Sequence, residues 1–366
     1  MTAPCSPTMD DFEQYRRPDE PQKQEKSYAW QTAIGLQAVD ALKPSEYLIQ
    51  TAHQHIDGDI TIREAQQRIE SYYRSRAVRN EQESRTEEAD KVSARIAEIL
   101  SEQAFTFSPV EYINIHRRLF EGLYPFAGRI RDYNISKKEW VLQGDSVLYT
   151  AAGIIRETLD YDFRVEKEFS YQTLSIPEAI NHLAKFISGL WQIHPFGEGN
   201  TRTTAVFTIK YLRSFGFDIR NETFARHSWY FRNALVRANY KNLSKGIYAT
   251  TEYIEAFFRN LILSEKHELK NRALLVKEAS PSEMAPPSAP KCKNCTLDCT
   301  LEELAVLNFL RNTPTATQKA LAAHLGKSER TIKAITVRLV KKGILERRNG
   351  KRNGFWVINT SEAGEA

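Results

Sequence analysis

The stretch that decides the fold is His194-Pro195-Phe196-Gly197-Glu198-Gly199-Asn200-Thr201-Arg202. Pro195 ends the helical run before it, because proline removes a backbone donor. Two glycines and an asparagine then form a short turn in which unusual backbone angles cost little. Thr201 starts a new amphipathic helix, and a turn that opens a helix presents unpaired N–H groups at the positive end of the helix dipole. These nine residues therefore predict an anion-binding loop.

The side chains of the loop indicate which anion it binds. Arg202 carries a forked cation that matches phosphate oxygens. Glu198 has no reason to face an anion unless a divalent metal such as Mg²⁺ stands between them. His194 can act as a general base near neutral pH. The alternative is a plain connection between two helices, with a packed histidine and a solvated glutamate; we favour the phosphate site because all these residue types fall within nine positions.

The loop resembles the signature of the Fic family, H-P-F-x-[D/E]-G-N-G-R-x-x-R. It departs from the signature twice: Thr201 stands in place of the second glycine, and Ala205 in place of the second arginine. Residues 115–120 and 124–131, Ile-His-Arg-Arg-Leu-Phe and Tyr-Pro-Phe-Ala-Gly-Arg-Ile-Arg, look like the family's segment before its β-hairpin flap. The resemblance covers about residues 105 to 262.

The resemblance implies protein adenylyl transfer (AMPylation), in which a hydroxyl of a target protein attacks the α-phosphate of ATP. His194 would take the hydroxyl proton and Glu198 would hold Mg²⁺. The residues that would bind the nucleotide are Phe196, Gly197, Gly199, Asn200, Thr201, Arg202 and, as part of the base pocket, Tyr240. The flap, roughly residues 130–148, would bind an extended target segment by strand addition around Ser136, Lys137 and Lys138. The alternative for the flap is a solvated hairpin without a ligand.

The two departures leave the transferred group open. Loss of a charge-assisted phosphate contact at Ala205 would cost about 1.5–3 kcal/mol. Two alternatives to AMP transfer follow: a Fic-fold phosphotransferase that uses another phosphate group, and a nucleotide-sensing, DNA-binding regulator without transferase activity.

Many Fic proteins are inhibited by a helix with the pattern [S/T]-x-x-x-E-[G/N]. Three partial matches occur: residues 51–58, where Asp57 replaces the glutamate as in a degenerate VbhA-like antitoxin helix; residues 84–88, ending at Glu88; and residues 264–268, ending at Glu268. We expect the N-terminal helical region to be the regulatory element.

The chain of 366 residues is too long for one typical domain. Composition and periodicity predict a mostly α protein. Its N-terminal part has a disordered lead over 1–27 and a helical region over 28–104, with a capping box at Thr61 and Glu64. An all-helical Fic core with a β-hairpin flap follows over 105–275, then a linker over 276–299 and a small basic domain over 300–360.

The small domain resembles a winged helix-turn-helix, since two helices, a third helix capped by Ser328 and a hairpin follow one another. Its basic residues predict contact with DNA, and the alternative is a winged helix used for protein contacts. The candidate DNA-binding residues are Arg330, Thr331, Lys333, Arg347, Arg348, Lys351 and Arg352.

Cys292, Cys295 and Cys299 could hold Zn²⁺ or an iron–sulfur cluster if a fourth ligand arrives, and the alternative is reduced surface thiols.

Four cysteines, no run of about 18 apolar residues and no N-terminal apolar signal indicate a cytoplasmic protein that has no membrane partner. The target protein is not identified by the sequence, and a homodimer stays open.

Overall fold

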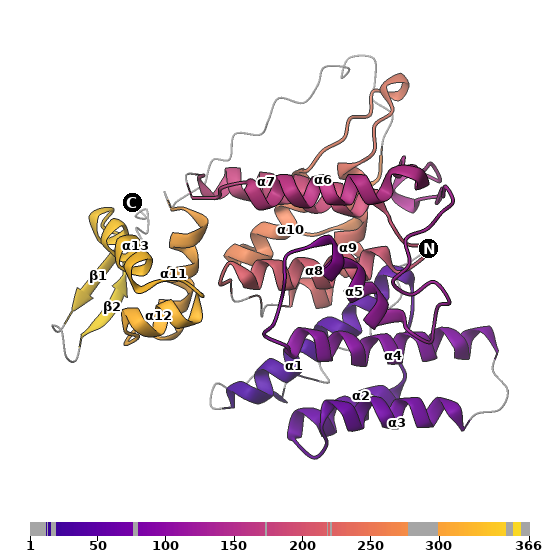
Figure 1. Cartoon of the computed structure of the whole chain (residues 1–366), viewed down its shortest axis with the longest axis horizontal. Coiled ribbons are helices and arrows are strands. Elements are labelled where there is room, and N and C mark those ends of the chain that lie inside the picture. The colour runs from indigo at the N-terminus through magenta and orange to yellow at the C-terminus, as the bar shows by residue number, and fades with distance from the viewer. Residues whose placement is uncertain are drawn as a thin grey trace. The chain divides into compact units, whose positions relative to one another are not determined.

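The structure is a computed structural model, and it describes residues 12, 14, 15, 20–75, 80–172, 174–217, 219, 222–276, 299–348 and 354–359. These residues are mostly helical, with one small two-stranded sheet, as predicted (Figure 1). The chain forms two compact units: residues 1–167, 184–210 and 220–284, and residues 168–183, 211–219 and 285–366. Among the described residues, no helix combines the length and the apolar character that crossing a bilayer requires.

The N-terminal helices are α1 (Pro21–Gly35), the 3₁₀ helix η2 (Leu36–Asp40), α2 (Glu46–Asp57), α3 (Ile62–Arg74) and α4 (Glu81–Ser101). Helix α1 packs on α4, and α2 and α3 form a neighbouring pair. The capping box at Thr61 and Glu64 is confirmed, because each side chain bonds the other residue's backbone N–H. Trp30 of α1 is fully buried.

The disordered lead over 1–27 is wrong at its C-terminal boundary, because α1 begins at Pro21. Two residues of the lead are also buried, Phe12 and Tyr15. Phe12 stacks on the ring of His53 at 4.9 Å, and the Tyr15 hydroxyl donates to Asp57 at 2.8 Å. Phe12 and Tyr15 are buried aromatic residues in a segment whose polar composition predicted disorder.

The region around the nine-residue loop contains α5 (Pro109–Phe120), α6 (Ile155–Glu168), α7 (Ile176–Ile193), α8 (Asn200–Ser214), α9 (Thr223–Ala238) and α10 (Glu252–Leu263), with short 3₁₀ helices at Trp140–Leu142 (η3), Ala152–Ile154 (η4), Leu243–Lys245 (η5) and Asn271–Leu274 (η6). The loop joins α7 to α8, as expected. Helix α6 was not predicted, although Ile155, Leu159 and Phe163 recur every four residues and are all buried.

The predicted β-hairpin flap has the course of a hairpin but no β ladder among its described residues. Its two arms are joined by a backbone bond from Glu139 to Asp145 of 2.9 Å and by a bond of 3.1 Å between the hydroxyls of Ser136 and Ser146. Side chains therefore replace most of the backbone ladder that the β-prone composition suggested.

The C-terminal domain contains α11 (Leu301–Asn312), α12 (Gln318–His324), α13 (Glu329–Lys341), β1 (Leu345–Arg348) and β2 (Phe355–Ile358). Ser328 caps α13 by accepting from Thr331 N, as predicted. The two strands pair antiparallel with Leu345 opposite Ile358. Ile332, Leu339 and Trp356 are buried and contribute to the core of the winged helix-turn-helix.

Candidate functional site

The loop is shaped by two positive backbone angles and one amide side chain. His194, directly after α7, has φ of 49° and Gly199 has φ of 77°. The Asn200 amide accepts from Phe196 N at 3.0 Å and donates to Phe196 O at 2.8 Å. This ring of two bonds closes the turn just before α8. Both ends of the amide are used, so Asn200 builds the loop. Its NH₂ group keeps a second N–H, and the contact of that group with a phosphate stays a prediction.

The loop rests on aromatic residues of α5. A Cβ at Gly199 would lie 2.4 Å from the Phe120 ring, so only glycine fits there. Phe196 is fully buried and stacks on His116 at 3.7 Å. Phe196 therefore anchors the loop, and its contact with a nucleotide stays a prediction.

His116 is a site residue that sequence reasoning did not single out. Its Nδ1 accepts from Gly128 N at 2.9 Å, and its Nε2 lies 3.0 Å from the carbonyl oxygen of Glu198. An Nδ1 that accepts leaves the proton on Nε2, which can then donate to that carbonyl. Burial lowers the pKa of His116 to about 4, so the ring is neutral and its tautomer is fixed.

His194 is only 3% exposed, and neither nitrogen of its ring has a hydrogen-bond partner. The ring packs against Tyr149 at 4.1 Å and against the edge of Trp191 at 5.4 Å. Burial, followed by the positive charge of Lys137, lowers its pKa well below the ordinary histidine value. A buried, neutral imidazole with free nitrogens is an unusual arrangement, because buried polar groups are generally paired. It suits a general base awaiting a proton.

Arg131 holds the backbone of this histidine, a role that no sequence pattern indicates. Its guanidinium is 5% exposed and donates to the carbonyls of His194 at 2.8 Å and Tyr133 at 2.6 Å. It also donates to Thr150 O at 2.5 Å, while its own N–H donates to Pro195 O at 2.8 Å. Arg131 thus ties both arms of the flap to the end of α7.

Glu198 contacts a cation that comes from the flap. The Lys137 ammonium lies 3.1 Å from Oε1 and 3.0 Å from Oε2 of this carboxylate. The Glu198 side chain is 41% exposed and its Oε1 also accepts from Gly199 N at 3.2 Å. A reachable carboxylate beside the N-terminus of α8, already neutralised by a cation, fits the expected Mg²⁺ ligand.

Arg202 is fully buried among acidic groups. Its guanidinium lies 2.8 Å from Asp40 and 2.7 Å from Glu88, and it stands 4.8 Å from the centre of the Phe120 ring. Gln37 accepts from it at 3.2 Å. Burial opposes its charge, yet the carboxylates of Asp40 and Glu88 and the Tyr124 hydroxyl outweigh burial and raise its pKa. The expected phosphate ligand is therefore engaged by the N-terminal helices.

Comparison with known proteins identifies the domain that carries this loop. Residues 106–212 match the Fic/DOC family, and they contain the loop, its aromatic support and the whole flap. This part of the chain is a Fic domain. Residues 303–346 match the family described as winged helix-turn-helix DNA-binding.

Two solved structures are similar to this chain. One is the N-terminal FIC domain of Bep8, a VirB-translocated Bartonella effector protein from Bartonella sp. 1-1C, at 20% identity over 50% of this chain and 87% of that one, with a TM-score of 0.40. The other is a Fic family protein from Desulfovibrio desulfuricans G20, at 12% identity over 98% and 94% of the two chains, with a TM-score of 0.41.

The remaining expected nucleotide residues of the Fic domain have structural partners. The Thr201 hydroxyl accepts from the Trp191 indole at 3.0 Å. Tyr240 is 5% exposed, and its hydroxyl donates to Asp145 of the flap at 2.7 Å. Tyr240 therefore fastens the flap. A Cβ at Gly197 would lie 2.7 Å from the Tyr133 hydroxyl, so this glycine leaves room for a side chain of the flap arm.

Buried and backbone contacts fasten the tip of the flap. Glu139 is 1% exposed and pairs with Arg232 of α9 at 2.6 Å. Val276 N donates to Val141 O at 3.0 Å, and Gln143 donates to Val276 O at 2.8 Å. Between the arms lies a groove of about 340 Å³, lined by residues 134–136 and 146–151. The groove includes Ser136, whereas Lys137 turns to Glu198 and Lys138 is exposed.

The three candidate inhibitory residues lie in different surroundings. Glu88 of α4 contacts Arg202 and accepts from the Tyr124 hydroxyl at 2.6 Å. Asp57 at the end of α2 instead accepts from Tyr15, and Glu268 is 71% exposed beside Lys270. Asp40 was not among the candidates; it lies 162 positions before Arg202 and matches no motif, so no spacing could have found it.

The exposed face of α13 in the winged helix carries Arg330, Thr331 and Lys333, as expected for a recognition helix. Other basic residues are paired internally. Glu303, 1% exposed, bonds Lys342 at 2.8 Å and Arg338 at 3.3 Å. In the wing, Arg348 pairs with Glu346, and Arg347 lies over the Trp356 ring at 4.9 Å. Lys351 and Arg352 lie outside the described residues.

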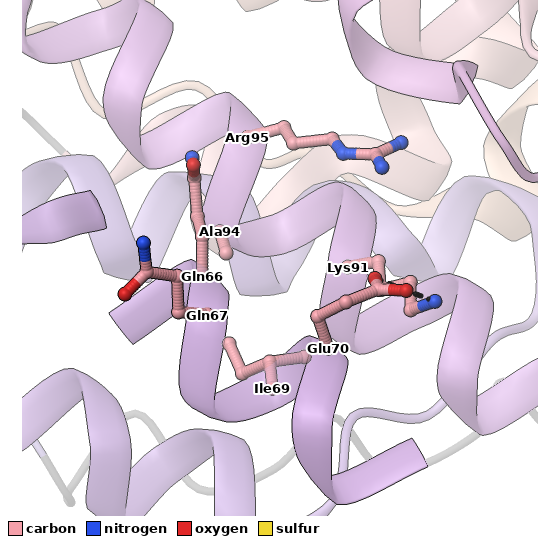
Figure 2. A pocket seen from close by; sticks show the side chains of 7 residues that line it. All are labelled: Gln66, Gln67, Ile69, Glu70, Lys91, Ala94 and Arg95. Carbon is pink, nitrogen blue, oxygen red and sulfur yellow. Dashed lines mark ion pairs between the residues drawn. The ribbon is translucent and has the colours of Figure 1, made fainter. Parts of the chain in front are cut away.

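Two features contribute nothing to the Fic loop. Cys299 is buried, Cys292 and Cys295 lie outside the described residues, and the described residues hold no cluster of three metal-ligating side chains. Figure 2 shows a second groove, of about 220 Å³, where Lys91 of α4 pairs with Glu70 of α3 at 2.8 Å. None of the residues that line this groove belongs to the loop.

Proposed function

We propose that the Fic domain is a protein adenylyltransferase, which transfers AMP from ATP to a hydroxyl side chain of a target protein. The observation that carries the proposal is His194: a neutral, buried imidazole with two unpartnered nitrogens, four positions before a carboxylate that already binds a cation. General-base catalysis requires a basic nitrogen that is free to accept a proton at working pH. The loop between α7 and α8 supplies N–H groups for the phosphate that reacts.

The proposed reaction forms one bond and breaks one. The target hydroxyl oxygen bonds to the α-phosphorus, the bond from that phosphorus to the bridging oxygen breaks, and pyrophosphate leaves. The hydroxyl proton goes to His194. Mg²⁺ held by Glu198 would neutralise phosphate charge. The groove between the arms of the flap is the proposed binding site of the target segment, because residues of both arms line it.

We further propose that nucleotide binding by the Fic loop is inhibited in this conformation of the protein. Arg202 is the loop cation expected to bind phosphate, and Asp40 and Glu88 bury it completely. In the inhibited family pattern, a glutamate pairs with the second arginine of the signature; Ala205 removes that partner here, and the pairing with Arg202 would serve instead. The N-terminal helices, through η2 and α4, would be the inhibitory element.

We propose that the winged helix binds DNA. Arg330, Lys333 and Lys341 of α13 have no carboxylate partner within the described part of the domain, so their charge is available to phosphates.

Labelled ATP tests the transferase proposal. The full chain carrying Asp40→Asn and Glu88→Gln, which relieves the proposed inhibition through Arg202, is incubated with Mg²⁺, cell extract as a source of target, and ATP labelled at either the α- or the γ-phosphate. Label transferred to protein from the α-position alone supports AMP transfer; label from the γ-position alone supports the phosphotransferase alternative. Nucleotide binding without transfer from either position supports the sensor alternative. His194→Ala should abolish transfer, whereas His267→Ala, at an exposed histidine outside the Fic domain match, should retain it.

A further inference from the structure

We propose that Lys137 is a resident counter-ion of Glu198, which a divalent cation must displace before it can bind there. Binding of the cation then releases the flap arm that carries Lys137. The inference rests on the proposed function only in taking Glu198 as the metal ligand.

The geometry of the pair is that of a cation seated on a carboxylate. The Lys137 ammonium is nearly equidistant from the two carboxylate oxygens, at 3.1 and 3.0 Å. Glu198 has no other charged partner among the described residues. Lys137 is 29% exposed, whereas the neighbouring Lys138 is exposed and makes no ion pair with any residue that the structure describes. Lys137 therefore pairs with Glu198, and a substitution of Lys138 is a matched control for a substitution of Lys137.

The flap is built so that this arm can release while the tip stays in place. The tip is fastened by Glu139 on Arg232, by Asp145 on Tyr240 and by the two bonds to Val276. All of these contacts follow residue 138 in the chain. The arm before it is joined to its partner by the hydroxyl of Ser146, which contacts Ser136 and the Lys137 backbone. The start of the arm is held elsewhere, because Arg131 N donates to Pro195 O at 2.8 Å and Asn134 Oδ1 accepts from Ala152 N at 2.9 Å. Single hydroxyl bonds at an exposed site are weak, and among the described residues the Lys137–Glu198 pair is the one ion pair that residues 134–138 make.

An ammonium and a divalent cation cannot share one carboxylate. Their mutual repulsion at a few ångströms exceeds the worth of a half-exposed ion pair, which is modest. When a divalent cation occupies Glu198, Lys137 must leave, and residues 134–138 lose this ion pair. Conversely, removal of the lysine charge should favour the divalent cation without any new ligand.

Mn²⁺ titrated alone, without nucleotide, and followed by electron paramagnetic resonance tests the competition in the full chain. Lys137→Met should tighten Mn²⁺ binding by about threefold or more, the equivalent of losing one half-exposed ion pair. Lys138→Met removes the same charge one position away and should change the affinity less than Lys137→Met. Glu198→Gln should abolish the gain that Lys137→Met produces.

Amide exchange supplies the second readout. Saturating Mn²⁺ should accelerate exchange of residues 134–138 and leave residues 139–145 unchanged. The proposal is overturned if Lys137→Met does not increase the affinity for Mn²⁺, or if that increase persists when Glu198→Gln is added. It is also overturned if Mn²⁺ does not change the amide exchange of residues 134–138. None of these measurements uses AMP transfer, so failure of the adenylyltransferase proposal gives a different result: coupled Mn²⁺ binding with no label transferred.

Discussion

Arg131 is a buried charge without a carboxylate partner among the described residues, and it is satisfied by main-chain carbonyls. Those carbonyls belong to His194 itself, to Tyr133 and to Thr150. A non-glycine residue with a positive φ, such as His194, persists only where its surroundings over-determine it. At the residue scale, the orientation of the proposed base therefore depends on an arginine that touches no ligand.

Arg131→Met should destabilise the protein by several kcal/mol, because each carbonyl left unpaired in the interior costs about 1–3 kcal/mol. Urea unfolding measures the loss. Arg129→Met, two positions away and exposed, should be close to neutral. Equal losses in the two variants would show that the contacts of Arg131 with the carbonyls are unimportant.

The buried histidines predict a pH dependence of stability. Burial lowers the pKa of both His116 and His55 to about 4, against about 6.5 in the unfolded chain. The unfolded state therefore binds more protons below pH 6.5. The stability is complete above that pH and falls, by an amount of the order of a few kcal/mol, as the pH drops towards 4. The free energy of unfolding should follow this course in urea titrations between pH 7 and 4.5.

A neutral replacement isolates the contribution of His116. His116→Gln keeps a donor and an acceptor but cannot titrate in this range, so the fall in stability with pH should be shallower. An unchanged slope would mean that the imidazole of His116 does not contribute.

At the scale of elements, η2 and α4 converge on the Fic loop through Asp40 and Glu88. The double variant Asp40→Asn, Glu88→Gln removes both negative charges from Arg202. It should increase the affinity for an ATP analogue, measured by calorimetry, because the guanidinium becomes free to bind phosphate. Glu81→Gln, at the exposed start of α4, should leave the affinity unchanged. Lower affinity in the double variant would contradict inhibition through Arg202.

The charges of α13 lead to a second prediction at this scale. Lys333→Ala should weaken DNA binding and reduce the slope of log affinity against log salt by about one. Lys342→Ala should have little effect on that slope, because Lys342 is paired with the buried Glu303. Fluorescence anisotropy on a DNA duplex at several salt concentrations separates the two variants. Equal slopes would place the DNA contact elsewhere.

The elements also show what the sequence could predict. Caps such as Thr61 and Ser328 are local hydrogen bonds between residues three apart, so pattern alone finds them. The flap was expected to be a β-hairpin because its residues favour strands, yet side-chain hydroxyls and anchors on α9 decide its course. Asn200, expected on phosphate, is used by the loop backbone because the turn needs it there. Long-range partners such as Asp40 and Arg202 have no sequence spacing or periodicity from which their contact could be predicted.

At the scale of the whole molecule, Val276 joins two parts of the chain with different roles. Its N–H and C=O are both bonded to the flap, and the residues that follow it lead along the chain to the winged helix. Gln143→Ala removes one of these bonds and should speed amide exchange at residues 139–145. His116 bonds Gly128 and Glu198 and not the tip of the flap, so its tautomer should be unaffected, as its NMR shifts would report.

The double attachment of Val276 has a thermodynamic consequence. If DNA on the winged helix changes the stability of the bonds at Val276, then a ligand that moves the flap must change the affinity for DNA by the same factor, because coupling between two binding sites is reciprocal. Anisotropy measured with and without an ATP analogue gives that factor from one side, and calorimetry with and without DNA gives it from the other. In Gln143→Ala both factors should shrink together, and the bonds of a single residue, Val276, would then account for the coupling between nucleotide and DNA.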